Sequence, residues 1–143
     1  MINKILDRLK MVDGATVREG FYAQGSAKEA CFIFLQPYTD AFSSTNGRDK
    51  YRDDLALQIV AGVTLTRTET PTSDLINLVR QIRSAFYKEQ RDTTKPDWLK
   101  EVALVSFQES EPCKYIMPEA HEKHGLAVIT LSITQTVEFG EKL

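Results

Sequence analysis

The sequence is poor in the residues that build disulfide-held or metal-held scaffolds. It has two cysteines, Cys31 and Cys113, and two histidines among 143 residues. Small disulfide-held domains are much richer in cysteine, so we expect two reduced thiols, with Cys31 buried in an apolar run. The histidines, His121 and His124, form a His-Glu-Lys-His pattern one residue short of the metalloprotease spacing, with no second ligand cluster. We therefore expect no metal and no cofactor.

Long apolar runs and a charge excess of one sign are also missing. No apolar run approaches the ~20 residues that a membrane-spanning helix needs, and the amphipathic N-terminus does not resemble a signal peptide. A net charge of −2 gives no overall attraction to nucleic acid or to anionic membranes. We expect neither membrane association nor specific DNA binding.

Catalytic motifs are missing as well. The seven glycines are scattered, without a phosphate-binding loop or a Gly-x-Ser-x-Gly elbow. The adjacent carboxylates Asp53 and Asp54 would point to opposite faces of a strand, so they cannot work together as an acid–base pair. We expect the run of mixed charges around them to be a solvated loop end. The sequence therefore predicts no catalytic residues and a protein that is not an enzyme.

The length and composition of the chain predict a single domain over residues 1–143, with 42% hydrophobic and 27% charged residues. Apolar residues recur at helical spacing near the N-terminus and again after Pro71, which predicts two main helices. We expect Asn3 to cap the first helix and Thr72 or Ser73 to cap the second. Alternating or compact apolar patterns predict strands at residues 16–22, 30–36, 54–68, 99–108 and 126–139. This order predicts an α+β fold: a twisted, mainly antiparallel sheet with both helices packed on one face.

The two longest polar segments, 37–53 and 109–125, are predicted to be loops. Three aromatic residues of the first segment, Tyr38, Phe42 and Tyr51, either anchor the loop to the core or contact a partner chain. Trp98, which precedes a predicted strand, is either a lid on the core or an interface anchor. The candidate interface residues are Tyr38, Phe42, Tyr51 and Trp98.

A short N-terminal helix is followed by the alternating strand Asp54–Val63, the helix Ser73–Phe86 and the terminal strand Leu126–Val137. This order and length resemble the tail terminator and minor tail proteins of long-tailed bacteriophages over most of the chain. The resemblance implies a virion tail protein, assembled in the host cytoplasm, that is not an enzyme and needs no cofactor. It implies a homo-oligomeric ring, commonly a hexamer, that caps the tail tube, stops tube polymerisation and joins the head. The implied partners are the tail tube protein and a head–tail connector or neck protein.

The hydroxyl-rich side of the terminal strand is either an ordinary solvated sheet face or the lining of a channel. A channel that passes DNA must not hold phosphates tightly, and small uncharged residues suit that purpose. The candidate lumen-facing residues are Thr130, Ser132, Thr134 and Thr136.

Two alternatives remain open. One is a phage neck or head-completion protein of similar build. The other is a small α/β enzyme or ligand-binding domain, which a pocket with perturbed ionisable groups would favour.

Overall fold

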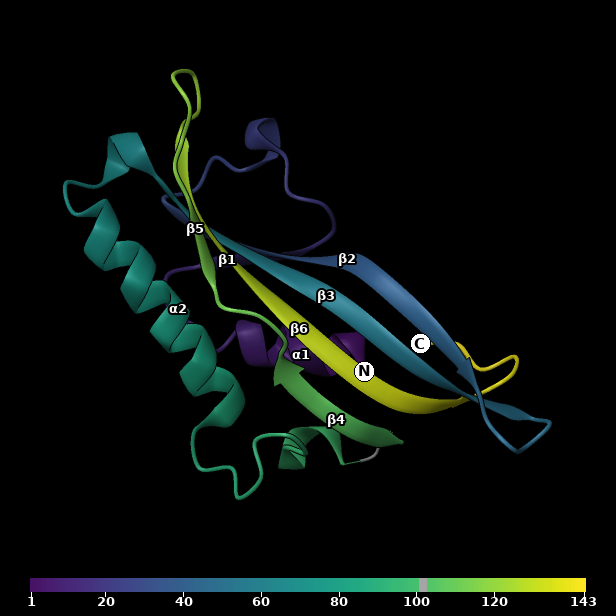
Figure 1. The fold of residues 1–143 in the computed structure, drawn as a ribbon. Coiled ribbons are helices and arrows are strands. Elements are labelled where there is room, and N and C mark those ends of the chain that lie inside the picture. Colours follow the sequence, from purple (N-terminus) through teal and green to yellow (C-terminus); the bar gives the residue numbers. More distant parts are fainter. Residues whose placement is uncertain (101–102) are drawn as a thin grey trace.

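The computed structural model describes residues 1–100 and 103–143, which form a six-stranded sheet with two α-helices (Figure 1). The helices are α1 (Ile2–Leu9) and α2 (Pro71–Tyr87). The strands are β1 (Thr16–Glu19), β2 (Cys31–Ser44), β3 (Lys50–Thr64), β4 (Leu104–Glu109), β5 (Lys114–Ile116) and β6 (His124–Glu138). Single 3-10 turns occur at Gln24–Ser26, Leu65–Arg67 and Asp97–Leu99.

The strand order is β1-β2-β3-β6-β4, and β5 also pairs with β6. The β1–β2 pair is parallel and the other pairs are antiparallel. The longest pair is β3–β6, in which Ile59 lies opposite Ile129 at the centre of the sheet. The predicted α+β fold with a mainly antiparallel sheet is confirmed.

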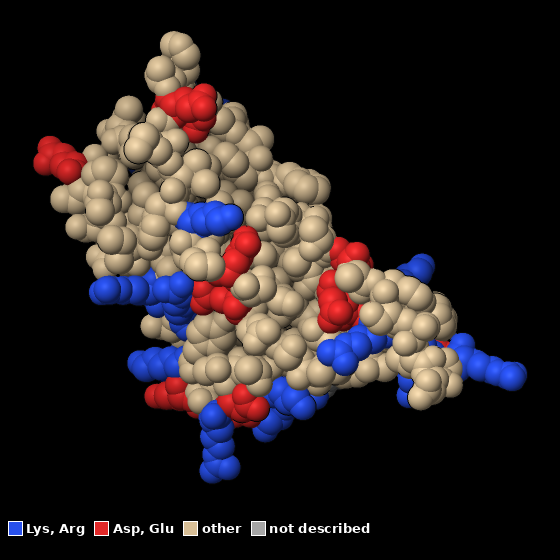
Figure 2. Space-filling model, viewed as in Figure 1, with Lys and Arg blue, Asp and Glu red and all other residues tan. Residues whose placement is uncertain are grey.

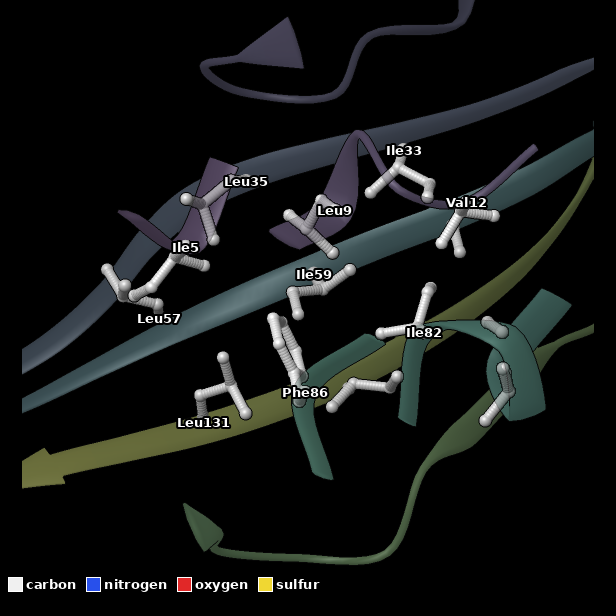
Figure 3. Close-up of a cluster of buried hydrophobic side chains, with 14 of the residues drawn as sticks. Ile5, Leu9, Val12, Ile33, Leu35, Leu57, Ile59, Ile82, Phe86 and Leu131 are labelled. Carbon is white, nitrogen blue, oxygen red and sulfur yellow. The ribbon is translucent and has the colours of Figure 1, made fainter. Parts of the chain in front are cut away.

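One face of the sheet packs against both helices, as predicted. Ile59 and Leu131 are fully or almost fully buried, and Phe86 of α2 lies between them (Figure 3). Ile5 of α1 lies beside Leu57 in the same core. Each fully buried aliphatic side chain of this kind contributes about 1.5–3 kcal/mol, so this face is the main source of stability.

A second, smaller cluster lies on the opposite face, where the chain after β1 folds back over the sheet. Tyr22 stacks on Phe32, with ring centroids 5.7 Å apart, and Phe34 packs edge-on against both rings. Gly62 allows this packing, because a Cβ there would lie 2.3 Å from the Phe32 ring. At this end of the sheet, therefore, both faces are buried.

The predicted loop at residues 37–53 is wrong. β2 continues to Ser44 and β3 begins at Lys50, so the segment is a long hairpin with a turn at residues 45–49. The Thr45 hydroxyl closes the turn by donating to the Lys50 carbonyl at 2.9 Å. The strands were missed because residues 37–50 are all exposed and so show no alternation of apolar and polar positions.

Other boundaries differ by smaller amounts. The 109–125 segment contains the short strand β5 and the start of β6. The strand predicted at 99–108 begins at Leu104, after a 3-10 turn; its residue Val102 lies outside the described residues. The N-cap positions are Met1 and Thr70 rather than the predicted polar residues, and neither makes a capping hydrogen bond.

The two cysteines, both described, are free thiols. Cys31 is half-buried rather than fully buried, because it begins β2 at the margin of the core. Burial, with a further contribution from nearby Asp74, raises the pKa of the Cys31 thiol.

Candidate assembly surface

Three strands extend past the helices as an arm, which we define as residues 38–54 together with residues 134–139. The helix-packed core ends near Leu55, which pairs with Ile133. Beyond that pair, β2, β3 and β6 continue to the lower right of Figure 1, away from α2. Backbone pairing between the strands continues along the whole arm, as far as the pair of Lys50 with Glu138 at its end.

Three aromatic rings gather at the end of the arm, and we call Phe42, Tyr51 and Phe139 the tip cluster. The Tyr51 ring lies 5.3 Å from Phe42 and 5.0 Å from Phe139 between centroids. Phe42 is 64% exposed and Phe139 is 58% exposed. The tip cluster is an apolar surface in water, and such a surface marks an interaction site when its residues are contiguous.

The other two candidate interface residues have different surroundings. Tyr38 is exposed and lies at the bulge between Pro37 and Thr39, so it is on the arm but outside the tip cluster. Trp98 packs against the core: its ring stacks on Phe86, and its Nε1 donates to the Phe86 carbonyl at 2.9 Å. Trp98 is therefore a lid on the core and does not belong to the arm.

A buried carboxylate lies in the arm. Asp53 is 8% exposed and pairs across the strands with Phe42. The run of mixed charges before it, residues 48–52, is exposed apart from half-buried Tyr51, as predicted, although residues 50–52 begin β3. Burial, followed by hydrogen bonding to and repulsion from Asp40, raises the pKa of Asp53 to about 6. Asp54 points to the opposite face, as predicted, and accepts a hydrogen bond from the Thr134 hydroxyl at 2.6 Å.

Asp40 and Asp53 line a groove of about 490 Å³, together with Tyr51, Leu55 and Gln135 among others. A raised carboxyl pKa in a cavity can mark a catalytic site. Here burial and the close approach of Asp40 account for the shift. Within the described part of the chain, no group of three His, Cys, Asp or Glu residues is placed to hold a metal ion.

The hydroxyl face of β6 divides into two kinds of position. Thr130 and Thr134 are buried, and their hydroxyls donate to Glu111 and Asp54 of the same chain. Ser132 and Thr136 are half-buried. All four lie on the face opposite the helices, as predicted; their assignment to a lumen stays a prediction.

The two histidines differ in environment. His124 begins β6, is 2% exposed, and its Nδ1 lies 2.6 Å from the Tyr22 hydroxyl. Its ring also lies 4.8 Å from the Phe32 ring. His121 is exposed in the preceding turn. His124 therefore belongs to the second cluster, whereas His121 is in contact with solvent.

The sequence interpretation missed two parts of the exposed apolar surface. Regular alternation along the predicted strand 126–139 would put Phe139 on the core face, but the strand leaves the core before that residue. The exposed apolar residues of β5 and of the position after it lie in a segment predicted to be a polar loop; they are Tyr115, Ile116 and Met117. Three consecutive apolar residues in a segment otherwise polar were the available signal.

A comparison of the chain with protein-family models and with curated protein sequences gives no match. The likeness to tail terminators therefore depends on the order, length and spacing of the elements. Among the helices that the structure describes, neither is both long and apolar enough to cross a membrane.

Proposed function

We propose that the chain is a structural subunit of a long-tailed bacteriophage, and that copies of it form a ring that caps the tail tube. In this role the ring stops polymerisation of the tube and presents the surface that joins the head. The observation that supports the proposal is the arm, which carries the aromatic rings of Phe42 and Phe139 into water beyond the helix-packed core. A contiguous exposed apolar surface of this kind is expected to be covered by a partner.

An arm that reaches from one copy to a different surface on the next copy makes a head-to-tail contact. Such contacts produce a closed ring when the rotation between copies closes, and a filament when it does not. A ring of this kind can stop tube growth, because it binds the last layer of the tube on one side. Its other side has a different surface, to which further tube subunits do not bind.

The second part of the proposal is a channel for DNA lined by the hydroxyl face. Ala56 and Gln58 of β3 lie opposite Ser132 and Thr130 of β6, so this part of the face is small or uncharged on both strands. Opposite Thr134 and Thr136 lie Asp54 and Arg52, whose charges are paired with each other at 3.9 Å. Contacts between cations and phosphates would bind DNA tightly and in a salt-dependent way. A face of this composition lets DNA pass without a specific grip.

Native mass spectrometry and negative-stain electron microscopy of the full chain, over a range of concentrations, test the ring. We expect one closed oligomer, and antibody labelling of separated heads and tails should mark the tail end. A chain that is monomeric at every concentration and unlabelled on tails overturns the proposal. Label on separated heads instead of tails supports the alternative of a head-completion protein.

The lumen is tested at Ser132 and Thr136, because lysines at the buried Thr130 and Thr134 would disturb the sheet itself. Ser132→Lys with Thr136→Lys should leave the ring intact and slow DNA ejection from assembled particles. Ser132→Asn with Thr136→Asn, which adds bulk without charge, should eject at the wild-type rate. Wild-type ejection by the lysine variant, with rings confirmed, removes this face from the channel.

A further inference from the structure

Two exposed apolar surfaces lie at opposite ends of β6. One is the tip cluster. The other, which we call the β5 patch, consists of Tyr115, Ile116 and Met117, which are 49%, 43% and 86% exposed. β5 pairs with β6 at residues 126–128, whereas the arm ends at the Lys50–Glu138 pair. Ten residues of strand separate the two sites, or roughly 33 Å at ~3.3 Å per residue, so one copy cannot bring them together.

Two short exposed segments, one at each end, carry opposite charge. The turn and the start of β3, residues 48–52, have three cations and one carboxylate, a net charge of +2. The segment that begins at Met117, residues 117–122, has two carboxylates, Glu119 and Glu122, and no Lys or Arg, a net charge of −2. Figure 2 shows blue side chains at the far end of the arm and red ones near the loop at the top. Each end therefore offers apolar side chains beside charges that suit the other.

Cations lie on several sides of the β5 patch. Lys114 of β5 is exposed on the face opposite the helices, 4.0 Å from Glu111, and Lys123 directly follows residues 117–122. Arg80 and Arg83 of α2 are close enough to influence the Tyr115 hydroxyl. Arg83 is already engaged by Glu109, with both of its hydrogen bonds at 2.9 Å. With Lys114 on one face and the two arginines on the other, Glu119 and Glu122 are the charges beside the patch that attract a basic surface.

We propose that the tip cluster of one copy docks on the β5 patch of the next copy, with the basic turn beside Glu119 and Glu122. This inference rests on the proposed self-assembly and names the two surfaces that make it. The contact joins two different surfaces, and each copy carries both of them. Each copy can therefore bind two neighbours, and the series of copies closes into a ring when the rotation between them allows it. Apolar contact supplies affinity, and the opposite charges set the orientation and the rate of association.

Two variants of the full chain separate the two surfaces. The tip variant carries Phe42→Ser and Phe139→Ser, and the patch variant carries Tyr115→Ser and Met117→Ser. All four residues are at least 49% exposed, so both variants should fold, with the wild-type Trp98 emission as the check. Met11→Ser, at an exposed residue on the α1 side, is the matched control and should assemble like the wild type.

We expect each variant alone to be monomeric by native mass spectrometry, and an equal mixture of the two to form a dimer. The mixture leaves one intact tip and one intact patch, which make a single contact and cannot extend. Glu119→Lys with Glu122→Lys should weaken wild-type assembly about tenfold, because it places cations against the basic turn.

The outcomes separate this inference from the proposed function. Rings formed by either variant alone, or a mixture that stays monomeric, overturn the docking of the tip cluster on the β5 patch. The proposed function still stands in that case if the wild-type chain forms rings. A wild-type chain that never assembles overturns both.

Discussion

β2, β3 and β6 pass through two different environments, the helix-covered half of the sheet and the arm. In the covered half, Ile59 and Leu131 face the helices and Val60 and Leu126 face the second cluster, so both sides are buried. In the arm, the same strands keep their pairing but expose most of their side chains. Burial of apolar side chains in the covered half therefore provides most of the stability of the fold. The exposed side chains of the arm contribute little to it and are available for contacts with other chains.

The largest expected contrast is between two phenylalanines, one in each region. Phe86→Ala should lower the free energy of unfolding by about 3–5 kcal/mol, because it empties a fully buried site. Phe42→Ala should lower it by less than about 1 kcal/mol, the range of one exposed cross-strand pair. Urea unfolding followed by circular dichroism measures both. Equal losses would mean that the arm is part of the core.

A smaller contrast comes from adding bulk instead of removing it. Gly62→Val should destabilise the chain by about 1–3 kcal/mol, since the new side chain meets the Phe32 ring. Ala41→Val, on the same face in the exposed arm, should change stability little. If Gly62→Val is tolerated equally well, the second cluster is not closely packed.

The arm should also carry a pH-dependent cost. The pKa of Asp53, raised from 3.8 to about 6, means that the folded chain holds a proton that the unfolded chain releases. Stability therefore falls as pH rises from about 4 to about 6, and the loss persists above pH 6. Asp53→Asn should be about 1 kcal/mol more stable than wild type at pH 7.5 and no more stable at pH 4.

Asp54→Asn, on the opposite face of the same strand, is the control for this measurement. It should keep most of the wild-type dependence of stability on pH, because burial and Asp40 are the main causes of the raised Asp53 pKa and the charge of Asp54 is the smallest of them. Urea midpoints at pH 4 and pH 7.5 give the comparison. An Asp53→Asn chain with the wild-type pH dependence would assign the effect to another group.

The smallest effect concerns reactivity rather than stability. In a Cys113→Ser background, Cys31 should react with a thiol reagent at pH 7.5 about tenfold more slowly than in unfolded chain, because burial raises its pKa and limits access. Cys31→Ser with Ser43→Cys moves the thiol to the exposed arm, where labelling should approach the unfolded rate. Equal rates at the two positions would contradict the difference in burial.

Burial explains which parts of the fold the sequence predicts. The inward faces of β3 and β6 follow from strict alternation of apolar and polar residues, and α2 follows from its apolar stripe. Trp98 could be either a lid or an interface residue from sequence, because a half-buried aromatic residue suits both. Its hydrogen bond to Phe86, twelve residues earlier, depends on how the chain turns after α2, and no local pattern in the sequence indicates it.

The arm was missed for the same physical reason. Strand prediction depends on one face being apolar, and residues 37–50 have no covered face to require it. The turn at residues 45–49 lies inside the predicted loop, but that prediction also includes the residues of the flanking strands. The three-ring cluster was also only partly found, since Phe139 joins it through the pairing of β6 with β3.

The central β3–β6 pair has a consequence for how the chain folds. Its partners are 60 residues apart for Thr64 and His124 and 88 residues apart for Lys50 and Glu138. The β2–β3 hairpin can close locally, but one long edge of β3 stays open until β6 arrives from far along the chain. Non-local pairing of this kind slows folding, and an open strand edge can pair with other chains meanwhile. Refolding yield should therefore fall as protein concentration rises, with aggregation competing against the arrival of β6.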